Sequence, residues 1–276
     1  MAAVAQEHSV YYHVLRSIYR LKVEEKVKSQ QNDHQRRSGW FYDLYLASPQ
    51  TESTLLELSE KYDIQPYFMA KYVLQGLCLA ERAATGASNT TGPSESRDVA
   101  KEARDMALQW LKKPALILSK SCDSALLQQQ VNVCFENDDT FGPLLDQSRR
   151  NAGMHYESIL AQHLLAAGAR FLNDGAMKAV RLSKTPDALL VTPLVVAGVT
   201  LRWVESKGLF GDPDTMAHHV ESQLLSYCDR YGPGLVIYWL GFVADTAESI
   251  MDTHRSIVIR DSFPVNATLL SSLTAE

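Results

Sequence analysis

The chain has 276 residues, of which 46% are hydrophobic and 21% charged, and its formal net charge is −5. These values are typical of a folded globular protein and exclude disordered, collagen-like and coiled-coil chains. The negative charge also argues against a protein that coats nucleic acid non-specifically, because that mode of binding needs many Lys and Arg contacts to phosphate. Any nucleic-acid site on this chain is therefore expected to be local.

Two observations predict an intracellular protein. Polar and charged residues between Glu7 and Lys22 interrupt the apolar ones, so we expect no secretory signal. The most apolar stretches, 188–201 and 234–244, are shorter than the ~20 residues of a membrane helix, so we expect no membrane association.

The four cysteines lack CxxC spacing, which predicts reduced, buried thiols and no zinc site or disulfide framework.

Helical spacing dominates the N-terminal part of the chain. Apolar residues recur at helical intervals from Val4 to about Ser29, and a second helix is predicted at 39–47. A turn around Asp63 then separates a short helix from a helix over 66–81, which is the pattern of a helix-turn-helix. An ordinary helical pair explains the pattern equally well, because a groove-reading helix usually carries more basic residues.

Basic residues in this part of the chain are few. The second helix of the pair offers only Lys71 and Arg82 on its expected exposed face. A basic stretch runs from Lys26 to Arg37, but charge runs of this kind are usually solvated helix ends. The N-terminal helices are therefore expected to dock either the substrate or a partner protein.

Composition divides the chain into four segments. Residues 1–82 form the helical region, and residues 83–98, which are rich in Gly, Ser and Thr, are typical of a flexible connector. Helical spacing over 99–140 predicts linking helices. Residues 141–276 differ, because they mix helical and β-type patterns.

This last segment is predicted to be an α/β (α+β) domain with a central mixed sheet. Helices are expected at about 151–167 and at 214–230. The β-type runs cover 187–192, 195–206, 234–243 and 256–260. These runs place two strands before the helix at 214–230 and two strands after it.

Three charged residues stand at the ends of the first two predicted strands. Asp187 begins one strand, and Glu205 and Lys207 end the next, where residues two apart face the same side. A hairpin turn near Ala197-Gly198 would bring Asp187 beside them. Two carboxylates suit Mg²⁺ or Mn²⁺, and a neighbouring lysine can polarise water or stabilise charge on a phosphate, which is phosphodiester hydrolysis chemistry. Taken alone, the pattern also fits solvent-exposed charges at a strand end.

Four stretches of the chain resemble the codanin-interacting nuclease family, which carries a Thr-Pro-Asp motif and belongs to the PD-(D/E)xK nuclease superfamily. They are residues 142–146, 184–187, 203–212 and 230–242. The resemblance implies a restriction-endonuclease-like αβββαβ core and metal-dependent cleavage of nucleic acid, with DNA favoured over RNA. It also implies a codanin-like partner and a location in the nucleus and cytoplasm.

Carried over position by position, the resemblance implies a metal site and a catalytic lysine. Asp187 and Glu205 fall on the metal-binding acidic positions, and Lys207 falls on the catalytic lysine. Glu157, on the helix before the sheet, matches an acidic residue that many superfamily members add to the metal site. Gln223 matches a glutamine of resolvase-like members, with an expected role in orienting the phosphate or the lysine.

Several neighbouring side chains are not assigned to the site. His218 and His219 are expected to be polar surface of a helix, because no carboxylate stands at the i+4 spacing of a metal pair. His155, two residues before Glu157, is expected to be a neighbour of the site and not a metal ligand. Leu225 and Cys228 replace aromatic residues of the family pattern, which leaves the contacts to substrate open.

Three functions remain open on this basis. The first is a divalent-metal-dependent nuclease, which the acidic set and the lysine favour. The second is a nuclease-fold protein that serves complex assembly, which the acidic net charge favours. The third is another metal-dependent hydrolase or transferase, but no P-loop, GxGxxG, HExxH or nucleophile-elbow pattern supports different chemistry. The substrate's structure and the oligomeric state are not predicted.

Overall fold

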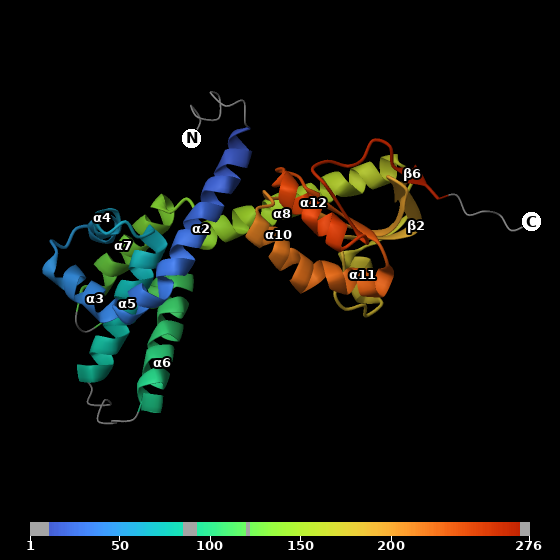
Figure 1. Ribbon diagram of the computed structural model, residues 1–276. Helices are drawn as coiled ribbons and strands as arrows, with labels where there is room; N and C mark the ends of the chain where they lie inside the picture. Colours follow the sequence, from blue (N-terminus) through green and yellow to red (C-terminus); the bar gives the residue numbers. More distant parts are fainter. Residues whose placement is uncertain (1–10, 85–92, 120–121, 271–276) are drawn as a thin grey trace, which may run out of the picture. The chain divides into compact units, whose positions relative to one another are not determined.

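The computed structural model describes residues 11–84, 93–119 and 122–270, which form a mixed α+β protein. Contacts separate the chain into two compact units (Figure 1). The helical unit spans 21–148, and the sheet unit spans 149–270 together with the start of the first described helix. Among the described residues, no helix is long and apolar enough to span a lipid bilayer.

Helices build the first unit almost entirely. They are α2 (Tyr12–Arg36), α3 (Ser38–Ala47), α4 (Thr54–Lys61), α5 (Pro66–Ala84), α6 (Pro93–Lys112), the short 3₁₀ turn η1 (Pro114–Leu116) and α7 (Ser124–Asn137), and α8 (Pro143–Ala166) leads into the sheet unit. The helices predicted at 39–47 and 66–81 are confirmed.

The central element of the helical unit is α5. Its residues 68–77 are all buried, and they share one core with Phe41 of α3, Leu55 of α4, Trp110 of α6 and Leu127 of α7. The helices predicted as links at 99–140 therefore belong to this core. A helix buried over ten consecutive residues presents no free face there to a DNA groove, so α4 and α5 form an ordinary helical pair.

The predicted connector at 83–98 is helical at both ends. The helix α5 continues to Ala84, and α6 begins at Pro93, where a proline suits the first helical turn. Residues 85–92 lie outside the described residues, as do residues 4–10 of the first predicted helix. All four cysteines are free, as predicted, but only Cys134 is fully buried.

The sheet unit has six strands. Its elements are β1 (Phe171–Asn173), α9 (Asp174–Ala179), β2 (Ala188–Val196), β3 (Val199–Lys207), α10 (Pro213–His219), the π-helical segment η2 (Val220–Leu224), α11 (Leu225–Tyr231), β4 (Gly234–Tyr238), α12 (Ala244–Thr253), β5 (Ile257–Arg260) and β6 (Thr268–Leu269). The strand order is β1-β2-β3-β4-β5, with β6 beside β2. Because β1–β2 and β2–β3 are antiparallel while β3–β4 and β4–β5 are parallel, the sheet is mixed, as predicted.

Helices cover both faces of this sheet. Along β4, Leu235 and Ile237 pack in the cluster that contains Leu160 of α8. The alternate residue Val236 packs in the cluster that contains Leu224 of the opposite helical layer. This alternation, together with burial of all five residues of β4, identifies β4 as a fully covered central strand.

The turn between β2 and β3 sets the register at the candidate site. Ala197 and Gly198 have φ values of 49° and 79°, and left-handed conformations at both central residues are typical of a two-residue hairpin turn. The pairing passes through an irregularity between Leu189 and Leu194 and then places Ala188 opposite Val204. Asp187 is thereby brought next to Glu205, as the sequence predicted.

Gly234 provides a test of the packing behind this strand end. An added Cβ would lie 2.0 Å from two ring atoms of the buried Trp203, so we expect Gly234→Ala to lower the free energy of unfolding by at least ~3 kcal/mol, the upper end of overpacking costs. Gly153→Ala is the matched control, because nothing lies within 4 Å of its Cβ position in α8. Its free energy of unfolding is expected to rise by about 0.5–1 kcal/mol, because alanine is favoured over glycine inside a helix. Urea unfolding of the two variants measures both effects, and equal stabilities would contradict the packing argument.

Candidate functional site

Hydrogen bonds connect the predicted site residues at the ends of β2 and β3. The Asp187 N–H donates to Glu205 Oε2 over 3.2 Å, and the Ser206 N–H donates to Asp187 Oδ2 over 2.7 Å. Lys207 Nζ donates to Glu205 Oε1 over 2.8 Å. The side chains of Glu205 and Lys207 are only 6% and 13% exposed, so these charges are not the solvated strand-end pair that the sequence left open.

Gln223 joins the same network from the helical layer. Its Oε1 accepts a hydrogen bond of 2.8 Å from Lys207 Nζ. Gln223 lies in the π-helical segment η2 between α10 and α11, and π segments inside helices are frequent at functional sites. The amide of Gln223 therefore contacts the lysine ammonium directly, and its role in orienting the lysine stays a prediction.

Burial makes the two carboxyl groups costly to ionise. Desolvation raises the pKa of Asp187 above its ordinary value, and the nearby Glu205 charge raises it further. Desolvation also raises the pKa of Glu205, although the Lys207 ammonium opposes this shift. The half-buried Asp187 carboxylate and the buried Glu205 carboxylate lie side by side with one ammonium, which contacts Glu205. This arrangement leaves negative charge that a divalent cation could neutralise.

Glu157 lies apart from this pair. It stands on α8, whose Leu160 packs on the sheet face opposite α10 and α11, and it is exposed on the rim of a cleft that Asp187 also lines. Its charge raises the pKa of Asp187. Over the described ranges, no three His, Cys, Asp or Glu side chains are grouped closely enough to hold a metal ion. The structure thus brings Asp187 and Glu205 together and leaves Glu157 at the edge.

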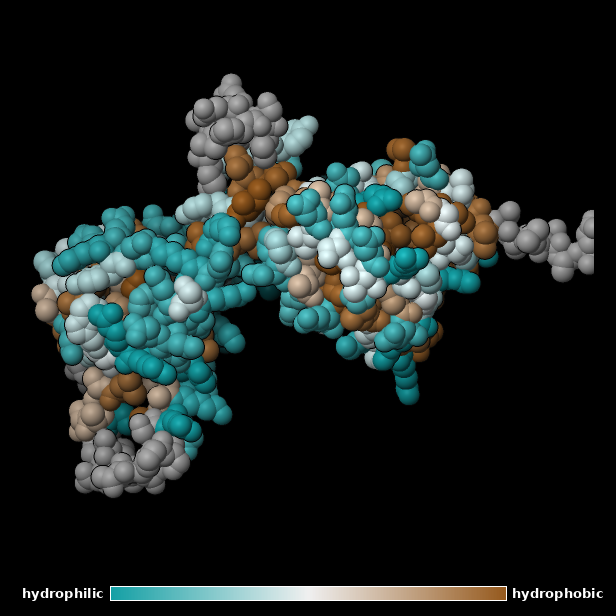
Figure 2. All heavy atoms as spheres, in the orientation of Figure 1, coloured by the Kyte–Doolittle hydropathy of each residue, from teal (hydrophilic) through white to brown (hydrophobic). Residues whose placement is uncertain are grey.

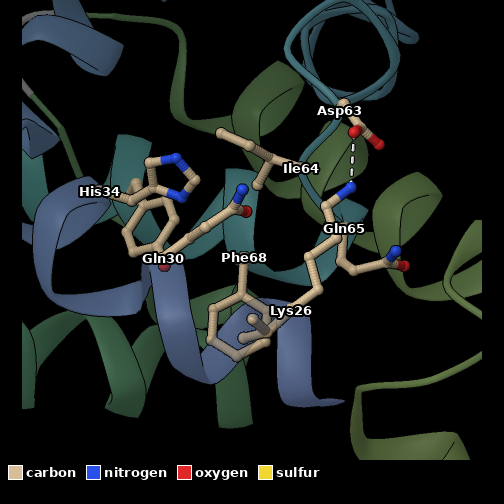
Figure 3. A pocket seen from close by; sticks show the side chains of 9 residues that line it. Lys26, Gln30, His34, Asp63, Ile64, Gln65 and Phe68 are labelled. Carbon is tan, nitrogen blue, oxygen red and sulfur yellow. Dashed lines mark hydrogen bonds and ion pairs between the residues drawn. The ribbon is translucent and has the colours of Figure 1, made fainter. Parts of the chain in front are cut away.

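The cleft beside Asp187 has a volume of about 430 Å³. Its wall combines apolar side chains of α8 with the start of α9, including Leu164 and Asp174. A second hollow, between α2 and the turn after α4, has room for about one water molecule and is closed by the Lys26 to Asp63 ion pair of 2.5 Å (Figure 3). Of these two hollows, only the cleft beside Asp187 is large enough for a ligand.

Two of the four Lys and Arg residues in the stretch 26–37 have partners within the protein. Lys26 pairs with Asp63, and Arg37 lies 4.3 Å from the ring centroid of Trp40. Lys28, Arg36 and Arg37 are exposed, and Figure 2 shows a mainly hydrophilic face of the helical unit. The stretch is therefore a solvated helix face, as the sequence favoured.

His219 is a neighbour of the site that the sequence did not assign. Its ring stacks on Tyr238 at 5.9 Å between centroids, and its Nδ1 lies 3.0 Å from the Tyr238 hydroxyl oxygen. Burial, with a smaller contribution from the charge of Lys207, lowers the pKa of His219 to about 4. Tyr238 is the β4 partner of Lys207. The prediction of a surface residue is wrong for His219 and holds for the exposed His218.

The raised pKa of Asp187 predicts a pH-dependent stability in the metal-free protein. Because the folded state keeps this proton to a higher pH than the unfolded state, stability falls as pH rises above about 3.8, the ordinary pKa. Asp187→Asn keeps an acceptor for the Ser206 N–H and removes the charge. At pH 7 in EDTA its free energy of unfolding should therefore exceed that of wild type by at least ~1 kcal/mol. The exposed Asp252→Asn is the control. Parallel stability curves for wild type and Asp187→Asn would contradict the prediction.

Comparison of the sequence with known proteins identifies a family that contains this chain. Residues 123–263, more than half of the chain, match the family described as "Protein of unknown function TPD sequence-motif", and Thr185-Pro186-Asp187 stands inside this range. No solved structure matches the chain.

Curated relatives from several vertebrates carry the name CDAN1-interacting nuclease 1. The Danio rerio protein is 32% identical over 238 residues, which cover 85% of this chain and 70% of the relative. The Mus musculus protein is 34% identical over 221 residues, 80% of this chain and 70% of the relative. The Homo sapiens protein is 33% identical over 216 residues, which cover 78% of this chain and 68% of the relative. The chain therefore belongs to the TPD sequence-motif family, the family of the CDAN1-interacting nucleases.

Proposed function

We propose that this chain is a divalent-metal-dependent nuclease that hydrolyses phosphodiester bonds, in DNA rather than RNA. The observation that carries the proposal is the half-buried hydrogen-bond network of Asp187, Glu205, Lys207 and Gln223 at one strand end. A structural ion pair would not need a second carboxylate beside it. The names of the vertebrate relatives support a nuclease.

The order of elements in the sheet unit supports a PD-(D/E)xK core. Helix α8 precedes three strands, and the helical layer α10 to α11 then precedes β4. Asp187 directly precedes the second of these strands, and Glu205 and Lys207 stand on the third, where the family pattern expects them. The short helix α9 is an addition between the first two strands.

The residues present fit a divalent cation with oxygen ligands. Asp187 and Glu205 would hold Mg²⁺ or Mn²⁺, and Glu157, on the rim of the cleft, would add negative charge near Asp187. The bound ion would stabilise developing negative charge and make a bound water more acidic. Lys207, oriented by Gln223, would donate to the attacking water or to a phosphate oxygen.

A second function rests on the relatives' name. CDAN1-interacting nuclease 1 is named for a protein partner, and the helical unit here contains no candidate catalytic residue. We propose that this unit contributes to complex assembly with a codanin-like protein in the nucleus and cytoplasm. Catalysis and assembly can coexist on separate units.

A cleavage screen tests the nuclease proposal directly. The purified chain is incubated with single-stranded, duplex, flapped and branched DNA and RNA in Mg²⁺, Mn²⁺ or EDTA. We expect cleavage of at least one DNA substrate with metal and none in EDTA. Absence of cleavage from every substrate with both metals, in a sample that is folded and binds Mn²⁺, would leave complex assembly as the function.

A further inference from the structure

The loop between α9 and β2 concentrates basic side chains next to the candidate site. Arg181 and Lys184 are exposed in residues 180–186, and neither forms an ion pair within the described part of the chain. Lys178 lies at the end of α9, and Arg230 of α11 reaches the loop from the other side. Lys178 is paired with Asp174 over 2.6 Å and Arg230 is bonded to Ser183, so Arg181 and Lys184 are the two loop cations left for a ligand beside the acidic site.

Both exposed cations occupy strained backbone positions. Arg181 has a φ of 60° and Lys184 a φ of 53°, the left-handed region that long side chains rarely adopt. At Arg181 the reason is the end of α9: the Leu182 N–H donates to Met177 O over 3.0 Å, and the Arg181 N–H donates to Lys178 O over 2.9 Å. Glycine is the usual residue in such a helix ending. Helix termination explains the conformation, but it does not explain an arginine there.

Hydrogen bonds hold the loop from two sides. The Arg230 guanidinium donates to the carbonyl oxygen of Ser183 and, over 2.9 Å, to its hydroxyl. The Tyr227 hydroxyl donates to Thr185 O over 3.1 Å, and Thr185 Oγ1 donates to Asp174 over 2.6 Å. Figure 1 shows the loop beside α11. The cations are therefore presented by a fixed backbone, which reduces the entropy lost when they bind a ligand.

The position of the loop indicates what it binds. Thr185 is two residues before Asp187, and its partner Asp174 lines the same cleft as Asp187 and Glu157. A polyanionic strand that approaches these carboxylates is repelled unless cations line its path. Because the whole chain has a net charge of −5, these cations must be local.

We propose that the loop 180–186 is a preformed phosphate-binding element in which Arg181 and Lys184 each hold one backbone phosphate of the nucleic acid beside the catalytic site. The inference rests on the proposed function for its substrate class. It assigns the loop no part in the chemical step.

The test is binding of fluorescently labelled DNA over a series of salt concentrations, in EDTA so that cleavage does not compete. Arg181→Gln and Lys184→Gln should each lower the slope of log affinity against log salt by about 0.9, the value for one lost phosphate contact on duplex DNA. The loss should be the same for unrelated DNA sequences. Lys101→Gln, an exposed lysine on α6, is the control and should keep the wild-type slope.

A second pair of variants separates charge from structure. Lys184→Gly removes both the charge and the backbone strain, so its melting temperature should equal or exceed that of wild type while its salt slope falls as in Lys184→Gln. Lys184→Arg should keep the slope. A lower melting temperature in Lys184→Gly, with wild-type DNA binding, would show a structural role and overturn the proposal.

The remaining outcomes are also decisive. Wild-type slopes in both Gln variants, or a wild-type chain that binds no nucleic acid, would overturn the proposal. Loss of a codanin-like partner with unchanged DNA binding would reassign the loop to a protein interface. Binding that depends on the loop in a chain that cleaves nothing would instead refute the nuclease function and leave the loop proposal intact.

Discussion

Lys207→Met is expected to lower the rate of metal-dependent cleavage by at least ~100-fold, the scale for losing one electrostatic donor in an active site. The ammonium of Lys207 is held by Glu205 and Gln223, each at 2.8 Å, so its direction is fixed before substrate binds. Methionine keeps most of the apolar stem and removes the charge. Single-turnover cleavage of the best substrate from the screen measures the effect.

The control for this variant is Arg202→Met, which removes an exposed cation from the same strand. It should cleave at a rate near that of wild type. Circular dichroism and capture of a codanin-like partner should be unchanged in both variants. Wild-type cleavage by Lys207→Met would exclude the lysine from the chemistry, and a loss of cleavage accompanied by unfolding would assign Lys207 to stability.

The centre of the site could be predicted from sequence because its geometry is local. Glu205 and Lys207 are two apart on one strand, and the Ala197-Gly198 turn fixes the strand that carries Asp187. Period-two alternation and a two-residue turn determine such an arrangement with little help from the rest of the fold. The strands β2 and β3 were therefore predicted to within a few residues.

Elements that depend on tertiary contacts could not be predicted in this way. The strands β1 and β6 have three and two residues, too few to show a period, and they exist because β2 offers them a pairing edge. The π-helical segment that carries Gln223 has no signature in the helical spacing of 214–230. The partial burial of His219 was missed for a related reason. Its partner Tyr238 lies on β4, so the contact cannot be read from the sequence of the helix.

The helical unit shows how a short motif can mislead. Two helices around a tight turn at Asp63 fit a helix-turn-helix, but the same pattern arises when the second helix is the core of a bundle. Lys71, expected on an exposed face, is buried, and desolvation lowers its pKa. What decides between the two structures is the packing of α3, α6 and α7 around α5, which follows from contacts far apart in sequence.

Asp187→Ala is expected to abolish Mn²⁺ binding that calorimetry detects in the wild-type chain. The half-buried Asp187 lies beside the buried Glu205, and desolvation together with their mutual repulsion raises the pKa of Asp187. A divalent cation relieves this repulsion, so affinity depends on both carboxylates being present. The exposed Asp252→Ala is the matched control and should bind as wild type does.

Thermal unfolding gives an independent measurement of the same event. An ion that binds only the folded state, at a free concentration one hundred times its dissociation constant, stabilises the folded protein by about 2.7 kcal/mol. Mn²⁺ should therefore raise the melting temperature of wild type and leave that of Asp187→Ala unchanged. The metal-free variant should be at least as stable as metal-free wild type, because it has lost a half-buried carboxylate that is costly to ionise. Equal Mn²⁺ affinities for wild type and Asp187→Ala would instead show that the carboxylates serve only the ion pair with Lys207, and the hydrogen-bond network would then be structural.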